Sequence, residues 1–336
     1  MAGRSAFLLH TQPWGNVLRG DTMAGPGARR DGPVVVIGAA SLDIKARART
    51  SLAPATSNHG TVTLSLGGVA RNVAENLARL GVPTCLVAAV GDDAFGEEIL
   101  RRTAASGVDT SCVLVAGGQR SATYCAILDE TGDMAVSVDD MQVVEALTPQ
   151  VVRSHRVLLA RSPMIVLDAN LSPRTLRAIL SLAKRAGTPV CMDPVSIDLA
   201  ERVKPHLADF AVITPNASEA AVLTGGPVGT LSEATQVAHR LLASGVRLVV
   251  ITLAEYGLYY AAPGGSGHIP APRVEVVDAT GAGDALTAGV VYGLMNGLPV
   301  DECMRLGVSA ATLTLRSPES VSPEMSLERI YEGMGA

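Results

Sequence analysis

Between residues 165 and 253, short apolar runs alternate with segments of helical periodicity, and few folds accommodate that order. The apolar runs are too short for helices and are typical of strands buried on both faces. They predict strand 165–167, helix 173–186, strand 189–192, strand 210–214, helix 233–243 and strand 248–253. The β-branched run Val34–Ile37 predicts the first strand of the same sheet. This alternation predicts a doubly wound α/β fold with a mostly parallel sheet.

A second set of predicted strands has a different pattern. Residues 61–66 alternate polar and apolar side chains, which is typical of a strand with one face in water. Further runs lie at 112–115, 122–128 and 134–138, and a turn rich in Asp and Gly joins the last two. We expect residues from about 45–66 and 110–138 to form a small antiparallel β lid beside the parallel sheet.

Length and composition fit one complete domain over residues 33–330. Of the 336 residues, 48% are hydrophobic and 18% charged, which excludes a mostly disordered chain. The net charge of -5 gives no basic field, so we do not expect a nucleic acid partner. No apolar run reaches the roughly 18 to 20 residues that span a bilayer, so no membrane partner is expected. The five cysteines are odd in number and far apart, which favours reduced thiols and a cytoplasmic location.

Residues 1–32 differ from the remainder in composition. They combine four arginines with two aspartates, several glycines and prolines, and no clear periodicity. This composition predicts a flexible N-terminal extension. Mitochondrial targeting is the alternative, although transit peptides are poor in acidic residues.

The strongest chemical signal is the run Asp278-Ala279-Thr280-Gly281-Ala282-Gly283-Asp284. It follows Glu275-Val276-Val277, interpreted as a strand, and precedes a predicted helix at 285–295. The N–H groups of Gly281, Ala282 and Gly283 at a helix start can stabilise developing negative charge. Asp284 beside them can accept a hydroxyl proton during phosphoryl transfer. The alternative is an ordinary glycine-rich turn with an aspartate in the first helical turn.

A second motif lies where strand 61–66 meets a predicted helix. Gly67 and Gly68 permit close contact between backbone and ligand, and Asn72 offers both a donor and an acceptor to a polyol. The alternative for this motif is a purely structural helix start.

Two weaker motifs follow later strands, at the edge where α/β sheets bind ligands. Asn216 and Glu219 come after strand 210–214, and a carboxylate there can hold Mg²⁺ through water. The alternative for this pair is a capping box. Thr252 lies near the end of strand 248–253, and Gly257 follows in a turn.

The order of these motifs, over residues 34–315, resembles that of the ribokinase-like (PfkB) carbohydrate kinases. The run from Asp278 to Asp284 is similar to the family motif D-T-x-G-A/x-G-D. The resemblance implies that Asp284 is the catalytic base and that residues 281–283 form the anion hole. Many relatives respond to a monovalent cation near this motif, so a K⁺ ion is expected around Asp278 and Thr280.

The same resemblance implies a substrate site and a nucleotide site. Gly67, Gly68 and Asn72 match the sugar-binding glycine motif of the family, and Asp43 matches its first-strand aspartate. Both motifs together imply contacts to a small polyol, sugar or nucleoside.

On the nucleotide side, Asn216 and Glu219 match the N-x-x-E motif that places Mg²⁺ and phosphate. Residues 252–257 resemble the segment Thr-Leu-Gly-x-x-Gly, which includes Thr252 and Gly257 of this chain, except that Ala254 replaces a glycine. ATP and Mg²⁺ are the cosubstrate and cofactor that this resemblance implies.

Within the family, residues 67–76, 139–141 and 166–171 resemble pseudouridine kinases. This resemblance implies the reaction of ATP with pseudouridine to give pseudouridine 5′-phosphate and ADP. Ribokinase, adenosine kinase and other sugar or nucleoside kinases are alternatives, because they share the core motifs. A non-catalytic nucleoside- or sugar-binding protein is the alternative from another class.

Further sequence patterns argue against two enzyme classes and favour one assembly. A Walker-type kinase is excluded, because none of the three lysines ends a G-x-x-x-x-G-K-[ST] loop. A dinucleotide dehydrogenase is not expected, because residues 38–43 lack the G-x-G-x-x-G pattern. An open apolar face on the lid would tend to be covered, which favours a homodimer formed through the lid.

Overall fold

The structure is a computed structural model, and it describes residues 30–334. Most of the predicted N-terminal extension, with its targeting interpretation, lies outside the described residues. Its last three residues contradict the prediction of flexibility, because they contact the folded domain. Arg30 Nη2 donates to the Ala186 carbonyl at 2.5 Å, and Gly32 N donates to the Arg161 carbonyl at 3.2 Å. The folded domain therefore includes residues 30–32, before the predicted boundary.

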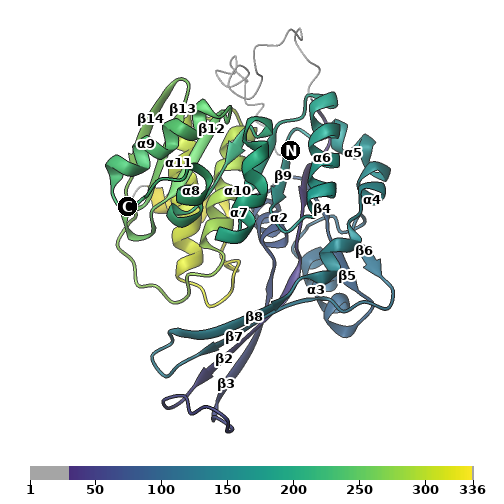
Figure 1. The fold of residues 1–336 in the computed structure, drawn as a ribbon, viewed down its shortest axis with the longest axis vertical. Coiled ribbons are helices and arrows are strands. Elements are labelled where there is room, and N and C mark those ends of the chain that lie inside the picture. Colours follow the sequence, from purple (N-terminus) through teal and green to yellow (C-terminus); the bar gives the residue numbers. More distant parts are fainter. Residues whose placement is uncertain (1–29, 335–336) are drawn as a thin grey trace, which may run out of the picture.

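The described part of the chain forms a doubly wound α/β sheet of eight strands, as predicted (Figure 1). The strand order is β14-β13-β12-β11-β10-β9-β1-β4, with parallel pairing from β4 to β12 and antiparallel pairing beyond. The strands are β1 (Val34–Ile37), β4 (Thr84–Val87), β9 (Ile165–Asp168), β10 (Val190–Asp193), β11 (Val212–Ile213), β12 (Leu248–Thr252), β13 (Leu258–Ala262) and β14 (Gly265–Ile269).

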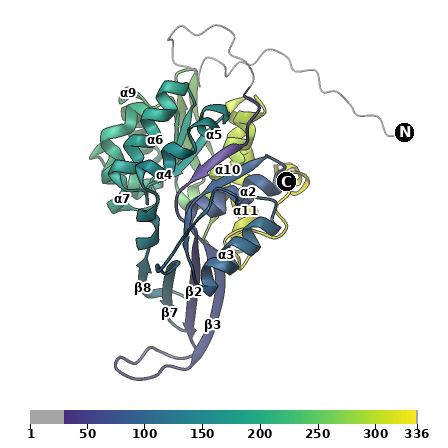
Figure 2. The same ribbon diagram turned by 90° about the vertical axis from the view of Figure 1, so that its right-hand side faces the viewer.

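Helices cover both faces of this sheet (Figures 1 and 2). The helices are α2 (Val69–Arg79), α3 (Ala94–Ala105), α4 (Pro149–Ser154), α5 (Arg156–Arg161), α6 (Pro173–Ala186), α7 (Ile197–Val203), α8 (Ala217–Thr224), α9 (Leu231–Ala243), α10 (Ala282–Met295), α11 (Val300–Leu315) and α12 (Leu327–Met334), with 3₁₀ turns η1 (Gln142–Ala146), η2 (Lys204–Asp209) and η3 (Ala254–Tyr256). None of the described helices is both long and apolar enough to cross a membrane.

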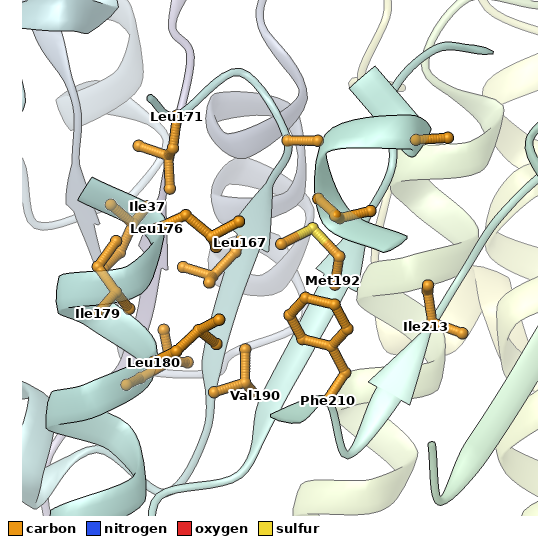
Figure 3. Packing of buried hydrophobic residues seen from close by; sticks show 14 of the residues in the cluster. Ile37, Leu167, Leu171, Leu176, Ile179, Leu180, Val190, Met192, Phe210 and Ile213 are labelled. Atoms are coloured by element: carbon orange, nitrogen blue, oxygen red, sulfur yellow. The ribbon is translucent and has the colours of Figure 1, made fainter. Parts of the chain in front are cut away.

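Alternate side chains along the strands point into two separate hydrophobic cores. Val35 and Ile37 of β1 point into one core, and Val34 and Val36 point into the other. The first core packs the sheet against α6, and Phe210 is one of its buried residues (Figure 3). The second packs the sheet against α2 and α10. Because both strand faces are dry, the strands have the continuous apolar character from which they were predicted.

A separate four-stranded sheet extends from the body of the domain (Figures 1 and 2). Its order is β3-β2-β7-β8, with β2 (Ser41–Ala48), β3 (Gly60–Gly67), β7 (Ala122–Leu128) and β8 (Met134–Asp140). The outer pairs are antiparallel as predicted, whereas the central pair β2 and β7 is parallel. We call this element the lid sheet.

The predicted run at 112–115 does not belong to the lid sheet, so the expected lid range from residue 110 is wrong at its start. The strand there is β6 (Leu114–Ala116), which pairs with β5 (Ala89–Gly91) in a two-stranded sheet. Leu114 packs against the first core, and Ala116 is buried in it. This apolar burial holds the run against the body of the domain.

The lid sheet has two chemically different faces. Its pairing register aligns Leu64, Ile44, Cys125 and Val138 in one row, and Val62, Ala46, Ile127 and Val136 in the next row on the same face. The opposite face carries Asp43 and Lys45, which belong to the same strand as Ile44. Four apolar side chains of the first face are strongly exposed: Val62 at 63%, Leu64 at 59%, Val136 at 55% and Val138 at 68%.

Candidate active site

The carboxyl ends of four parallel strands bring polar residues to one edge of the main sheet. Asp168 ends β9, Asp193 ends β10, Asn216 follows β11, and Thr252 ends β12. The main chains of the last two meet directly, since Thr252 N donates to the Pro215 carbonyl at 3.0 Å. Ligands of open α/β sheets bind in the crevice outside this edge.

Helix α10 brings Asp284 to the same edge. It begins at Ala282 with Gly281 as its N-cap, and Asp284 lies buried in its first turn. The N–H groups of a first turn lack intrahelical partners, so this end can receive negative charge. Thr287 Oγ1 donates to Thr214 Oγ1 at 3.1 Å, which fixes the helix against the end of β11.

Gly281 is required by its surroundings. Its φ of 81° lies in the left-handed region, and a Cβ atom there would overlap the Ser320 carbonyl.

The strand expected at 275–277 does not form, so that prediction is wrong. Val276 and Val277 are exposed, and Val277 N donates to the Leu315 carbonyl at 2.8 Å instead of joining a sheet.

The glycine motif before α2 lies directly against α10. Asn72 Nδ2 donates to Asp284 Oδ2 at 2.6 Å, and both side chains are buried. A Cβ atom on Gly67 would overlap the Asp43 carboxylate, so the missing side chain makes room for this acid. The structure therefore brings together the two motifs that sequence analysis assigned to substrate and to catalysis.

Lys45 is a site residue that sequence analysis did not identify. From strand β2 of the lid sheet, its ammonium group forms an ion pair with Asp278 and donates to Thr280 Oγ1 at 2.8 Å. Burial opposes ionisation of Asp278, but the hydrogen bonds from Lys45 and Thr280 outweigh it and lower the pKa of this carboxyl. The alternation of polar and apolar residues along β2 is the signal that predicts this side-chain direction.

Asn216 and Glu219 form the capping box that was the structural alternative for this pair. Asn216 Oδ1 accepts from Glu219 N at 2.9 Å, and Glu219 Oε2 accepts from Asn216 N at 2.9 Å. Both residues also line a cavity of about 520 Å³ beside the sheet edge, together with residues 195–198 and Ser218. The pair therefore caps α8 and also lines this cavity.

The segment after β12 tolerates the replacement of a family glycine at a cost. Ala254 has a φ of 50°, in the left-handed region that a glycine adopts without strain. For an alanine this conformation costs about 1–2 kcal/mol. Gly257, with a φ of 90°, lies so close to the Ile269 carbonyl that a Cβ atom would overlap it. A tight turn thus forms at Thr252–Gly257 despite the substitution.

Buried carboxyl groups dominate the electrostatics of the site. Burial raises the pKa of Asp284 to about 7, against the lowering effects of the Asn72 hydrogen bond and the Arg71 charge. Burial likewise raises the pKa of Asp43, Asp168 and Glu219. For Asp193, burial and then the charges of Asp284 and Glu219 raise the pKa well above its ordinary value.

Asp168 and Asp193 are further residues of the site to which sequence analysis gave no role. Asp168 Oδ2 accepts from Ala39 N at 2.8 Å and from Ala70 N at 3.1 Å, so it joins the end of β1 to the start of α2. Asp193 lies within electrostatic range of both Asp284 and Glu219. An acid placed directly after a buried parallel strand is the signal that predicts both positions.

Comparisons with known proteins give consistent results. The model of the pfkB family carbohydrate kinases matches residues 32–326. The chain is 33% identical over 298 residues to pseudouridine kinase from Escherichia coli strain K12, covering 88% of this chain and 95% of that protein. It is 28% identical over 295 residues to guanosine-inosine kinase from Exiguobacterium acetylicum, covering 87% and 97%.

A solved structure supports the fold. Arabidopsis thaliana ribokinase complexed with ribose and ATP superposes with a TM-score of 0.81 and 22% identity, covering 91% of this chain and 99% of that chain. This likeness concerns the fold alone, and it confirms the predicted ribokinase-like architecture.

The raised pKa of Asp284 predicts a pH dependence of stability. Between the ordinary aspartate pKa of 3.8 and about 7, the folded state keeps a proton that the unfolded chain releases, so the unfolding free energy falls as pH rises through this window. Asn at this position cannot ionise. We expect Asp284→Asn to lose less stability than the wild type between pH 5 and pH 8, by on the order of 1 kcal/mol or more, in urea denaturation followed by circular dichroism. Equal losses would contradict a raised pKa.

Proposed function

Since the chain belongs to the pfkB family of carbohydrate kinases, we propose that it transfers the γ-phosphoryl group of ATP to the 5′-hydroxyl of a nucleoside. As a kinase of this family it is a phosphotransferase with an alcohol group as acceptor. The proposed substrate is pseudouridine, and the products are pseudouridine 5′-phosphate and ADP. The observation that carries the proposal is the buried Asp284 carboxylate at the N-terminus of α10, held by Asn72.

In the proposed mechanism Asp284 is the catalytic base. Its carboxylate takes the proton of the substrate hydroxyl, while the hydroxyl oxygen forms a bond to the γ-phosphorus and the bond from that phosphorus to the ADP oxygen breaks. The N–H groups of Gly281, Ala282 and Gly283 stabilise the charge that develops on the transferring group. Asp43, Gly67, Gly68 and Asn72 bind the ribose ring, as the family motif implies.

The nucleotide side of the site fits a divalent cation that is held through water. The Glu219 carboxylate is buried beside Asp193 and lines the 520 Å³ cavity with Asn216, so the donor set is oxygen-rich, as Mg²⁺ prefers. Mg²⁺ would neutralise phosphate charge there. Thr252 and Gly257 form the turn proposed to contact the nucleotide. For K⁺, the Asp278 carboxylate is already paired with Lys45, so we propose that K⁺ binds to backbone oxygens near Asp278 and Thr280.

Two observations favour a nucleoside over a free sugar. Both curated relatives described above are nucleoside kinases by name. In addition, the register of the lid sheet aligns Asp43 with Tyr124 and Asp139, so the ring-bearing Tyr124 and the acidic Asp139 share the face of Asp43. An aromatic ring and an acid can contact a base beyond the ribose. Ribokinase or another sugar kinase activity is the second candidate, and a non-catalytic binding protein is the third.

We also propose that the lid sheet closes over the substrate and that its apolar face pairs with the same face of a second copy. The two in-register apolar rows described above would be covered in this way, which leaves the face of Asp43 to the substrate. A flat apolar face of this extent is rarely left in water.

Replacing the base tests the mechanism. We expect Asp284→Asn to lower kcat by about 10²- to 10⁴-fold, because the amide cannot accept the hydroxyl proton. The assay couples ADP release to a spectroscopic signal at saturating substrate. Asp209→Asn, at an exposed acid that ends η2 and precedes β11, lies at the opposite edge of the sheet, so it is the matched control and should keep kcat within about twofold. Unchanged phosphorylation of every tested substrate by Asp284→Asn would show that the assignment of the base is wrong.

The same assay tests the substrate. Among pseudouridine, uridine, adenosine, ribose and fructose, we expect the highest kcat/KM with pseudouridine, and a higher rate in K⁺ than in Na⁺. A marked preference for free ribose would contradict the nucleoside proposal. Equal rates in the two salts would argue against the K⁺ site, and no turnover of any compound would favour the binding protein.

The dimer predicts a sensitivity to charge on the lid. We expect Leu64→Lys combined with Val138→Lys to give a monomer in light scattering, because the substitutions place charges on the apolar face. Both side chains are already exposed, so the fold should persist. Val157→Lys, at a valine that is 61% exposed on α5, is the control. A wild-type protein that is itself a monomer would refute this assembly.

A further inference from the structure

Arg71 is a fully buried cation beside the candidate active site, and the proposed mechanism does not use it. It lies in the first turn of α2, next to Asn72, with 2% of its surface exposed. Its Nε donates to the Gly67 carbonyl at 2.9 Å, and its Nη2 donates to the Leu66 carbonyl at 2.9 Å. A buried guanidinium is costly unless such partners surround it, so this position has a specific structural purpose.

The far side of the guanidinium is held by Glu75. Arg71 Nη1 donates to Glu75 Oε2 at 2.5 Å, and Arg79 Nε donates to the other oxygen of the same carboxylate at 2.9 Å. Glu75 is thereby fixed from two sides, one turn further along α2. The planar guanidinium cannot rotate without breaking several of these bonds.

The near side of the guanidinium determines the orientation of the Asn72 amide. Arg71 Nη2 donates to Asn72 Oδ1. A guanidinium has only donors, so the oxygen of the amide must face Arg71 and the NH₂ group must face the other way. On that other side lies Asp284, which accepts from Asn72 Nδ2 at 2.6 Å. Without Arg71, the amide could turn and accept through its oxygen a hydrogen bond from the protonated carboxyl, whereas the held NH₂ group donates and so favours the carboxylate.

From this geometry we propose that Arg71 is a positioning residue for phosphoryl transfer. It holds the Asn72 oxygen so that the Asn72 NH₂ group donates to Asp284 and favours the ionised form of the base against the effect of burial. The inference rests on the proposed function, in which Asp284 is the base.

The other charged groups around Asp284 oppose this effect. Asp43 on β2, Asp168 at the end of β9 and Asp193 at the end of β10 are all acids, and each acts against ionisation of its neighbours. Arg71 is the cation that acts on Asp284 from α2 and favours the carboxylate. Its loss would therefore remove both the charge and the oriented donor at once.

The test is the pH profile of kcat in Arg71→Met, Arg71→Lys and the control Arg79→Met. We expect the acid limb of Arg71→Met to move upward by about one pH unit or more, so that its activity relative to wild type is about tenfold lower at pH 6 than at pH 8.5. Arg71→Lys keeps the charge but loses the planar set of guanidinium N–H donors. Its acid limb should therefore move upward by less than that of Arg71→Met. Arg79→Met loses a cation from the same helix without touching Asn72, and its limb should remain that of the wild type.

A second measurement needs no turnover. Carboxyl NMR, with the Asp284 signal assigned by its absence in Asp284→Asn, should show the same upward shift in either folded Arg71 variant. If Arg71→Met does not fold, Arg71→Lys carries the test. If a folded Arg71 variant has the wild-type acid limb of kcat and the wild-type NMR titration midpoint of Asp284, the inference is wrong. Asp284 remains the base in that case, provided that Asp284→Asn is inactive. An active Asp284→Asn would instead refute the proposed function itself.

Discussion

The hydrogen bond between Asn72 and Asp284 joins two segments that lie 212 residues apart in the chain. It is buried, and one of its partners is an acid whose pKa is raised by that burial, so its geometry must be supported from several directions. Helix α2 supports it through Arg71, and α10 supports it through contact with the end of β11. The core between these two helices and the sheet fixes the distance at which the bond can form.

The parallel sheet explains why so many polar residues meet at one edge. Strands β9, β10, β11 and β12 run in the same direction, so the residues that follow each of them are placed side by side whatever their separation in sequence. Burial at this edge then raises the pKa of several carboxyls together. A polyanionic cosubstrate with its cation would meet acids whose protonation depends on one another.

Sequence patterns were sufficient where periodicity and burial agree. The helix predicted at Pro173–Ala186 has the observed bounds, because its cap residue, apolar spacing and final glycine all indicate the same limits. Sequence patterns gave a wrong prediction where contacts with distant parts of the chain determine the local structure. Residues 275–277 contain two β-branched valines and were interpreted as a strand, yet none of the described strands pairs with them, and Val277 N donates to the Leu315 carbonyl instead. Sequence patterns indicate the face of β2 on which Lys45 lies and the strand end at which Asp193 lies, but that both residues meet at one site follows only from the pairing of β2 and the order of the strands.

The alternation of side chains along β2 limits which mutations this strand can accept. Ile44 lies on the apolar face of the lid sheet, and its immediate neighbours Asp43 and Lys45 lie on the opposite face beside the site. Because side chains alternate along a strand, a shift of one residue in register would exchange the two faces completely. A one-residue insertion or deletion in β2 would therefore turn its apolar side chains toward the site unless a bulge absorbed it, whereas a point substitution changes one face alone.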